Sequence, residues 1–144
     1  MKDTIVVHCS DTPASMDIGV ETIRDWHVNG NGWSDIGYNV VITRSGEIQG
    51  GRDLDGDGDF YEETGAHARG FNTTSIGVCL VGGMTADKKG AEFNFTRPQM
   101  ISLEAIVNDI RSKIGTPVRV VGHRDLDSSK ECPCFDVKEY FGEV

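Results

Sequence analysis

The sequence has no long apolar run and few basic residues, and each shortage excludes a class of protein. No apolar stretch approaches the roughly 20 residues that a membrane-spanning helix needs. The 14 Lys and Arg residues are outnumbered by 23 Asp and Glu residues, which gives a formal net charge of −9. Such a charge disfavours attraction to nucleic acid or to an anionic membrane surface. We therefore expect neither nucleic acid nor a membrane as a partner.

The cysteine count is even, which would allow two disulfides in a secreted protein. The four cysteines are Cys9, Cys79, Cys132 and Cys134. Residues 1–4 lead directly into a strand-like segment, and no signal peptide is visible, so we expect synthesis in the cytoplasm and reduced thiols. Cys79 lies in an apolar run, and Cys9 follows His8 on a strand, which turns it to the opposite face. Both are therefore predicted to belong to the core.

The chain of 144 residues with 38% apolar content predicts one domain over residues 1–144, and we expect a monomer. Apolar periodicity predicts strands at 4–8, 38–44, 47–50, 75–81 and 118–121, and helices at 20–28, 97–114 and 135–141. Thr96 can cap the long helix, and Gln99 completes a capping box. Because strands and helices interleave, the fold class is α/β, with a central mixed β-sheet flanked by helices.

Two histidines stand where strands end, which is where sites gather in open α/β sheets. His8 ends the first predicted strand, His123 follows the last one, and Cys132 comes nine residues later. Two neutral imidazoles and one thiolate can hold zinc and leave a fourth position open for water. The spacing alone also fits structural histidines and a buried cysteine. Three interpretations of Cys134, two residues beyond Cys132, stay open: a spare ligand, a disulfide partner or a bystander.

Several short motifs occur in an order that resembles a known family. They are Val7-His8-Cys9-Ser10, Gly37-Tyr38-Asn39, Gly65-Ala66-His67-Ala68, Asn72 with Ser75-Ile76-Gly77-Val78, Gly122-His123-Arg124-Asp125 and Lys130-Glu131-Cys132-Pro133. From about residue 5 to residue 141 the chain resembles N-acetylmuramoyl-L-alanine amidases of the bacteriophage lysozyme and peptidoglycan-recognition type. The resemblance implies hydrolysis of the amide between the lactyl group of N-acetylmuramic acid and L-alanine in bacterial peptidoglycan. It also implies a central mixed sheet flanked by helices.

The resemblance implies a role for six residues. The Zn²⁺ ligands that it implies are His8, His123 and Cys132. Tyr38 matches a tyrosine facing the metal-bound water, Lys130 a catalytic lysine, and His67 a histidine lining the substrate groove. Two features depart from the phage enzymes: Cys134 replaces a small residue, and the loop at 52–64 is longer.

That loop is acidic and resembles the start of an EF-hand. Its candidate Ca²⁺ ligands are Asp53, Asp55, Asp57 and Asp59. Oxygen ligands at positions 1, 3 and 5 with glycine at position 6 fit an EF-hand loop. Position 12 is Thr64 where a glutamate is expected, although Glu62 and Glu63 are adjacent. Two interpretations remain: a nonstandard structural calcium site, or a solvated acidic turn.

Alternatives to a zinc amidase differ in what they require of Cys132. A non-catalytic peptidoglycan-binding module of this fold lacks the cysteine ligand. A cysteine hydrolase would use Cys132 as the nucleophile with a histidine. Some phage lysozymes of this type also bind and inhibit a phage RNA polymerase, a role on which the sequence is silent. An amidase made in the bacterial cytoplasm and released by a holin would act on the cell wall, in the periplasm or outside.

Overall fold

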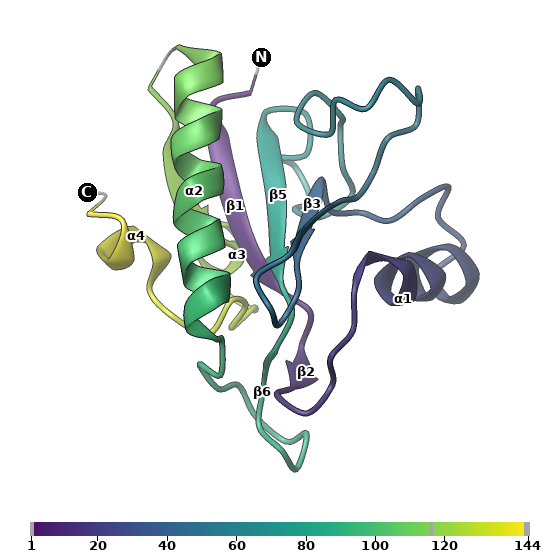
Figure 1. The fold of residues 1–144 in the computed structure, drawn as a ribbon, viewed down its shortest axis with the longest axis vertical. Helices are drawn as coiled ribbons and strands as arrows, with labels where there is room; N and C mark the ends of the chain where they lie inside the picture. The colour runs from purple at the N-terminus through teal and green to yellow at the C-terminus, as the bar shows by residue number, and fades with distance from the viewer. Residues whose placement is uncertain (1, 116, 143–144) are drawn as a thin grey trace.

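A central β-sheet organises the protein, whose computed structural model describes residues 2–115 and 117–142 (Figure 1). Within these residues the strands lie in the order β4-β3-β5-β1-β7. Their bounds are β1 Thr4–Cys9, β3 Val40–Ile42, β4 Ile48–Gly50, β5 Ser75–Leu80 and β7 Arg119–Gly122. All pairings are parallel except that of β3 with β4. The predicted mixed sheet is confirmed.

The ends of several elements differ from the sequence prediction. The strand expected at 38–44 is the shorter β3, Val40–Ile42, although backbone hydrogen bonds continue at residues 38, 39 and 43, and a hairpin turn joins it to β4 as predicted. The helix expected at 20–28 is α1, Val20–Asp25, and it continues as one π-helical turn, η1, Trp26–Gly30. Beyond the main sheet, two-residue strands β2, Thr12–Pro13, and β6, Gly83–Met84, pair with each other.

One face of the sheet is covered by the long helix α2, Arg97–Ile114. The predicted capping box is present: Gln99 N–H donates to Thr96 Oγ1 at 3.2 Å, and Thr96 N–H donates to Gln99 Oε1 at 2.8 Å. The helix contributes to the main core through Leu103, Ile106, Val107 and Ile110. The sheet contributes Ile5, Val7, Cys9, Val40, Ile42, Ile76, Val78, Leu80 and Val120. This face therefore holds most of the buried apolar area.

The other face is less fully covered, and it carries the alternate residues of the same strands. Ile23 of α1 packs there against Val41 and Cys79. Val6 and Val121 form a smaller cluster with Ala68. Short helices α3, His123–Leu126, and α4, Val137–Tyr140, follow β7. Between the two small clusters, this face leaves room for polar groups.

No helix in the described part of the chain is both long enough and apolar enough to cross a membrane. The longest one, α2, alternates buried positions with exposed polar ones, as an amphipathic helix on a sheet does.

The fold predicts that stability depends strongly on the α2 face. Leu103→Ala removes a side chain that is 0% exposed, so it should lower the free energy of unfolding by about 2–5 kcal/mol. Ile101, on the same helix, is 54% exposed, and Ile101→Ala should change the free energy of unfolding by less than about 0.5 kcal/mol. Urea unfolding followed by circular dichroism measures both. Equal effects of the two substitutions would contradict the packing described here.

Candidate active site

His8 and His123 meet on the open face because β1 and β7 are neighbours. Val7 of β1 is in register with Gly122 of β7, and His123 follows Gly122 as the first residue of α3. The two imidazole centroids are 4.5 Å apart. His8 is only 1% exposed, because it points out of the sheet beneath the loops that follow the strands. Adjacent strand ends thus bring together residues 115 positions apart in the sequence.

Cys132 completes a group of three potential metal ligands. One nitrogen of each histidine and the Cys132 sulfur all lie within 4.8 Å of one another. The backbone N–H of Cys9 donates to the Cys132 sulfur at 3.0 Å, which fixes the thiol beside β1. Burial holds the pKa of His8 well below its ordinary value, and burial also lowers that of His123. Both imidazoles are therefore neutral near pH 7, which is the form that binds metals.

The other cysteines lie outside this group. Cys9 and Cys79 are buried, as predicted for core residues. The Cys134 thiol donates to the carbonyl oxygen of Gly83 at 3.1 Å, and its sulfur lies 3.9 Å from that of Cys9. A hydrogen bond with Cys132 raises the pKa of the Cys9 thiol. A hydrogen bond with Cys9 raises the pKa of the Cys134 thiol. The structure thus brings Cys132, and not Cys134, to the two histidines.

His67 lies directly behind His8 and is joined to it by a hydrogen bond. Nδ1 of His67 is 2.8 Å from Nε2 of His8, and Nε2 of His67 is 3.3 Å from Oγ of Ser75. The Ser75 hydroxyl donates its proton to the carbonyl oxygen of Phe71 at 2.7 Å, so it accepts from His67. His67 then accepts the Nε2 proton of His8. This order leaves Nδ1 of His8 with a free lone pair.

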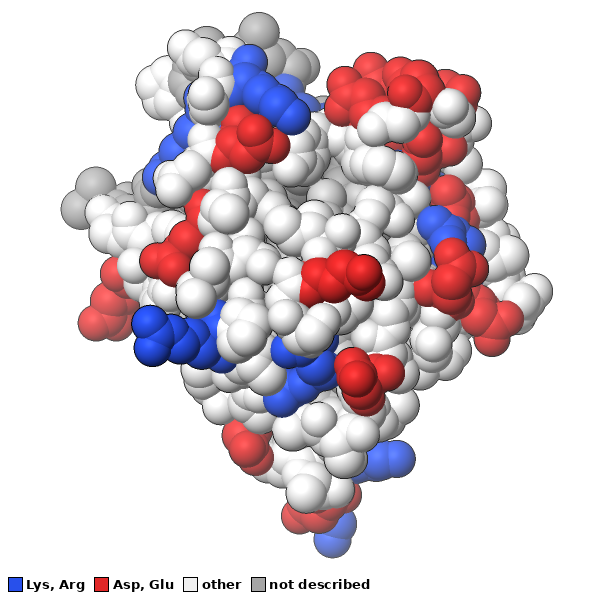
Figure 2. All heavy atoms as spheres, in the orientation of Figure 1, with Lys and Arg blue, Asp and Glu red and all other residues white. Residues whose placement is uncertain are grey.

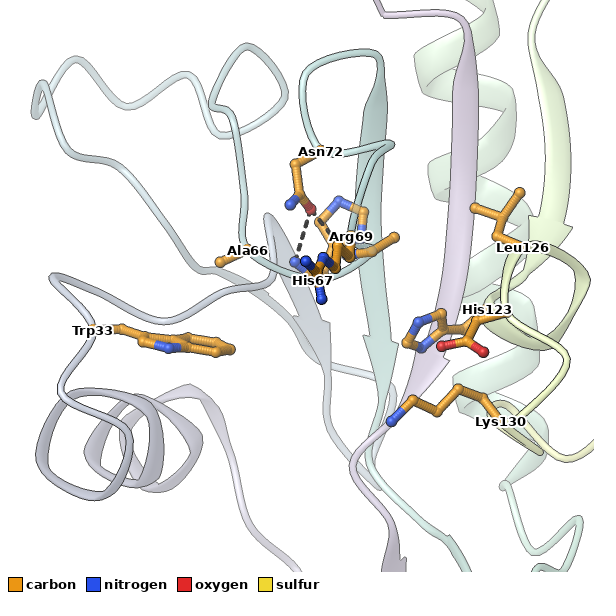
Figure 3. Close-up of a pocket in the computed structure, with 10 residues that line it drawn as sticks. Trp33, Ala66, His67, Arg69, Asn72, His123, Leu126 and Lys130 are labelled. Carbon is orange, nitrogen blue, oxygen red and sulfur yellow. Dashed lines mark hydrogen bonds between the residues drawn. The ribbon is translucent and has the colours of Figure 1, made fainter.

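A glycine in β5 makes room for the His67 ring. A Cβ atom at Gly77 would come within 2.5 Å of Cγ of His67. The backbone on either side of His67 is held by Asn72, whose Oδ1 accepts from the N–H groups of His67 and Ala68, each at 2.9 Å (Figure 3). Burial lowers the pKa of His67 to about 3, so this imidazole is neutral as well. The ring is therefore fixed in place and uncharged.

Tyr38 and Lys130 approach the group from different elements. The Tyr38 ring centroid lies 5.1 Å from that of His8, and burial raises the pKa of its phenol well above the ordinary value. Tyr38 therefore stays protonated and can donate a hydrogen bond. Lys130 comes from the exposed loop after α3, and its side chain extends beside His123 (Figure 3). The structure thus places both residues beside the histidine pair.

A groove opens over these residues. Two hollows of about 420 and 300 Å³ both reach Trp33, Ala66, His67, His123 and Lys130. His8, Tyr38 and Cys132 line the smaller hollow, so the potential metal ligands are reached from the surface. The sequence interpretation missed Trp33 and His27. The His27 ring lies against Trp33 in a tilted arrangement, with 4.7 Å between centroids, and its Nδ1 accepts the Gly37 N–H at 2.9 Å.

The acidic loop after β4 also gathers carboxylates, though not quite the predicted set. Oxygen atoms of Asp53, Asp55, Asp57 and Glu63 all lie within 4.8 Å of one another. Asp59 is not in this group, and its carboxylate accepts the backbone N–H of Tyr61 at 3.2 Å. Figure 2 shows a red acidic patch at the upper right, where Figure 1 shows the loops beside β3 and β5.

Comparison with known proteins agrees with the geometry of the site. The sequence pattern of the N-acetylmuramoyl-L-alanine amidase family matches residues 2–135. The chain belongs to this family. It is an N-acetylmuramoyl-L-alanine amidase in which His8, His123 and Cys132 form a potential metal site.

Individual relatives support the same assignment. An endolysin of Klebsiella phage KP32 is 42% identical over 137 residues, which cover 95% of this chain and 83% of that protein. N-acetylmuramoyl-L-alanine amidase LysC of Clostridium intestinale superposes with a TM-score of 0.74 at 25% identity, covering 99% of this chain and 87% of that one. The structure of bumblebee PGRP-SA superposes with a TM-score of 0.73 at 23% identity. The match covers 98% of this chain and 80% of that one, and the two proteins share the fold.

Proposed function

We propose that this amidase is zinc-dependent and hydrolyses the bond between the lactyl group of N-acetylmuramic acid and L-alanine of the stem peptide. The observation that carries the proposal is the group of His8, His123 and Cys132, with ligand atoms within 4.8 Å, at the floor of an open hollow. The endolysin relatives support peptidoglycan of the bacterial cell wall as the substrate.

The donor set fits zinc better than other common metals. Two imidazole nitrogens and one thiolate make a soft, three-ligand set that leaves a tetrahedral position open. Bound there, zinc would act as a Lewis acid and lower the pKa of a water molecule to about 7. His8 is preorganised for this role, because its Nε2 proton is directed to His67 and its Nδ1 lone pair is free.

Tyr38 and Lys130 supply the charge stabilisation that amide hydrolysis requires. Negative charge develops on the carbonyl oxygen as the amide is attacked, and donors already in place lower the barrier most effectively. The Tyr38 phenol is protonated and lies beside His8, so it can donate a hydrogen bond to that oxygen. Lys130, whose side chain is cationic, lines the same hollow as Tyr38. We assign the two residues to the transition state and not to zinc binding.

His67 has a supporting role in this proposal. It was predicted to line the substrate groove, and it does border both hollows. Its side chain is nevertheless buried, and both ring nitrogens are within hydrogen-bonding distance of protein atoms. A group with no free donor or acceptor has little to offer a substrate. We therefore propose that His67 mainly orients His8, as residues behind metal-bound histidines commonly do.

Digestion of purified peptidoglycan tests the reaction. We expect the protein to release L-alanine amino termini without new reducing sugar ends, because it cuts an amide and not a glycosidic bond. Removal of metal by a strong chelator should abolish the activity, and added zinc should restore it. Amino-group and reducing-end assays on the same digest measure the two products.

Two outcomes would contradict the proposal. New reducing ends would show a glycosidase. Unchanged activity after verified zinc removal, combined with loss on thiol alkylation, would instead favour a cysteine hydrolase that uses Cys132.

Substitution of Tyr38 or Lys130 separates catalysis from metal binding. Tyr38→Phe and Lys130→Met should each lower kcat by roughly 10²–10³-fold, as loss of a transition-state donor does. Zinc content should stay at the wild-type level, since neither side chain belongs to the ligand group. Steady-state kinetics and elemental analysis on the same samples measure both. Loss of zinc in either variant would mean that its residue supports the metal site instead.

Zinc titration distinguishes the candidate thiols. Cys132→Ser should lose stoichiometric zinc, whereas Cys134→Ser should keep it, because only Cys132 joins the histidine group. His67→Ala should retain zinc with roughly 10–100-fold weaker affinity, the usual effect of losing a residue that orients a ligand. Competition with a chromophoric chelator measures all three affinities. Zinc loss in Cys134→Ser alone would overturn the ligand assignment.

A further inference from the structure

The acidic loop contains a buried carboxylate oxygen that has no hydrogen-bond partner in the described protein. Glu63 is only 9% exposed, and its Oε1 atom makes no hydrogen bond. Oδ1 of Asp53, in the same group, is likewise buried and unpartnered. Buried charges in proteins are ordinarily paired or bound to a metal, because removing a bare carboxylate from water is costly. A solvated acidic turn therefore does not account for Glu63.

No cation of the described residues forms an ion pair with these carboxylates. Arg52 directs its guanidinium to the carbonyl oxygen of Thr64 and the hydroxyl of Ser34. The Lys2 ammonium donates to the backbone carbonyl of Glu63 at 2.8 Å, and not to its carboxylate. Among the described residues, no ion pair involves the carboxylates of Asp53, Asp55, Asp57 or Glu63. Four negative side chains thus converge with only the positive charge of Lys2 near Glu63 and no ion pair among the described residues.

The spacing of the carboxylates fits a single ion of calcium size. Oxygen ligands lie about 2.3–2.6 Å from Ca²⁺, so those around one ion are at most about 4.6–5.2 Å apart. The four carboxylates meet this limit, with ligand atoms within 4.8 Å of one another. Zinc prefers nitrogen and sulfur ligands, and Mg²⁺ is seldom held by a cage of several carboxylates. An all-oxygen group on a loop favours calcium.

The sequence pattern and the structure together identify the ligands. Asp53, Asp55 and Asp57 occupy positions 1, 3 and 5 of an EF-hand-like loop, with Gly58 at position 6. The carboxylate that an EF-hand places at position 12 comes here from position 11, Glu63. We propose that Asp53, Asp55, Asp57 and Glu63 form a calcium site separate from the active-site group.

The position of this site gives it a structural role beside the groove. The carbonyl oxygen of Glu63 accepts from Asn39 Nδ2 at 2.9 Å, which ties the end of the loop to the sheet. The chain then continues through residues 64–66 to His67, which bonds to His8. Bound calcium would hold the segment that forms this wall of the groove. The site would therefore stabilise the fold near the active site without taking part in the reaction.

Calorimetric titration of the zinc-loaded protein with CaCl₂ in calcium-free buffer tests the proposal. We expect about one Ca²⁺ per chain and a rise in Tm of roughly 3–10 °C at saturation. Glu63→Gln should weaken calcium binding at least about tenfold, because it removes a charged ligand while keeping the shape of the side chain. Asp57→Asn, at an exposed position, should do the same without disturbing the interior.

Asp59→Asn is the matched control, since it removes one charge from the same loop but lies outside the ligand group. It should bind calcium nearly as well as the wild type. Cys132→Ser should also bind calcium normally, which separates this site from the active-site group.

The stability of Glu63→Gln gives an independent check. Without calcium this variant should melt at a higher temperature than the wild type, because it lacks a buried unpaired charge. With saturating calcium the order should reverse. The absence of calcium binding by the wild type, an equal response to MgCl₂, or an equal loss of binding in Asp59→Asn and Glu63→Gln would overturn the proposal.

Discussion

The alternation of side chains along β1 is the constraint on which the rest of the structure depends. Successive residues of a strand point to opposite faces, so Val7 and Cys9 enter the core beneath α2 while His8 enters the groove. The strand is buried between β5 and β7, and its register is set by both neighbours. His8 therefore has little freedom to move. The geometry of the whole active site follows from the place of this one imidazole.

Electrostatics and hydrogen bonding reinforce the position of His8. Burial disfavours the charged form of both His8 and His67, so the two rings share a proton-ordered hydrogen bond without repelling each other. Ser75 completes the order by giving its own proton to a backbone carbonyl. This chain of neutral groups thus leaves the lone pair on Nδ1 of His8 available to a metal ion. Because the ring is already oriented, metal binding requires less rearrangement of the protein.

Much of this arrangement could be predicted from the sequence, because it depends on local patterns. Strand periodicity, the capping box at Thr96 and the placement of His8 and His123 at strand ends gave the fold class and brought the two histidines together. The family resemblance favoured Cys132 as the ligand, but the local pattern could not separate it from Cys134, since both lie in the same irregular segment. In the structure, the Cys132 sulfur lies with the two histidines and accepts from Cys9 N–H, whereas the Cys134 thiol is directed to Gly83.

Other features depend on tertiary packing and leave no local signal. His27 has the spacing of an ordinary helix residue, and Trp33 lies in a loop, yet both border the groove. Gly77 resembles any strand glycine until the His67 ring is placed against it. In the acidic loop, regular spacing favoured Asp59, but the backbone turns its carboxylate toward Tyr61 and brings Glu63 inward instead.

Helix α2 covers only one face of the sheet, and this affects where substitutions can accumulate in the protein. The α2 face supplies most of the cohesion, and the opposite face supplies the chemistry. Substitutions on the two faces that are well separated and share no partner should combine almost independently. Substitutions beneath α2, by evolution or by engineering, could therefore change thermal stability. Substitutions along the groove could separately change substrate preference.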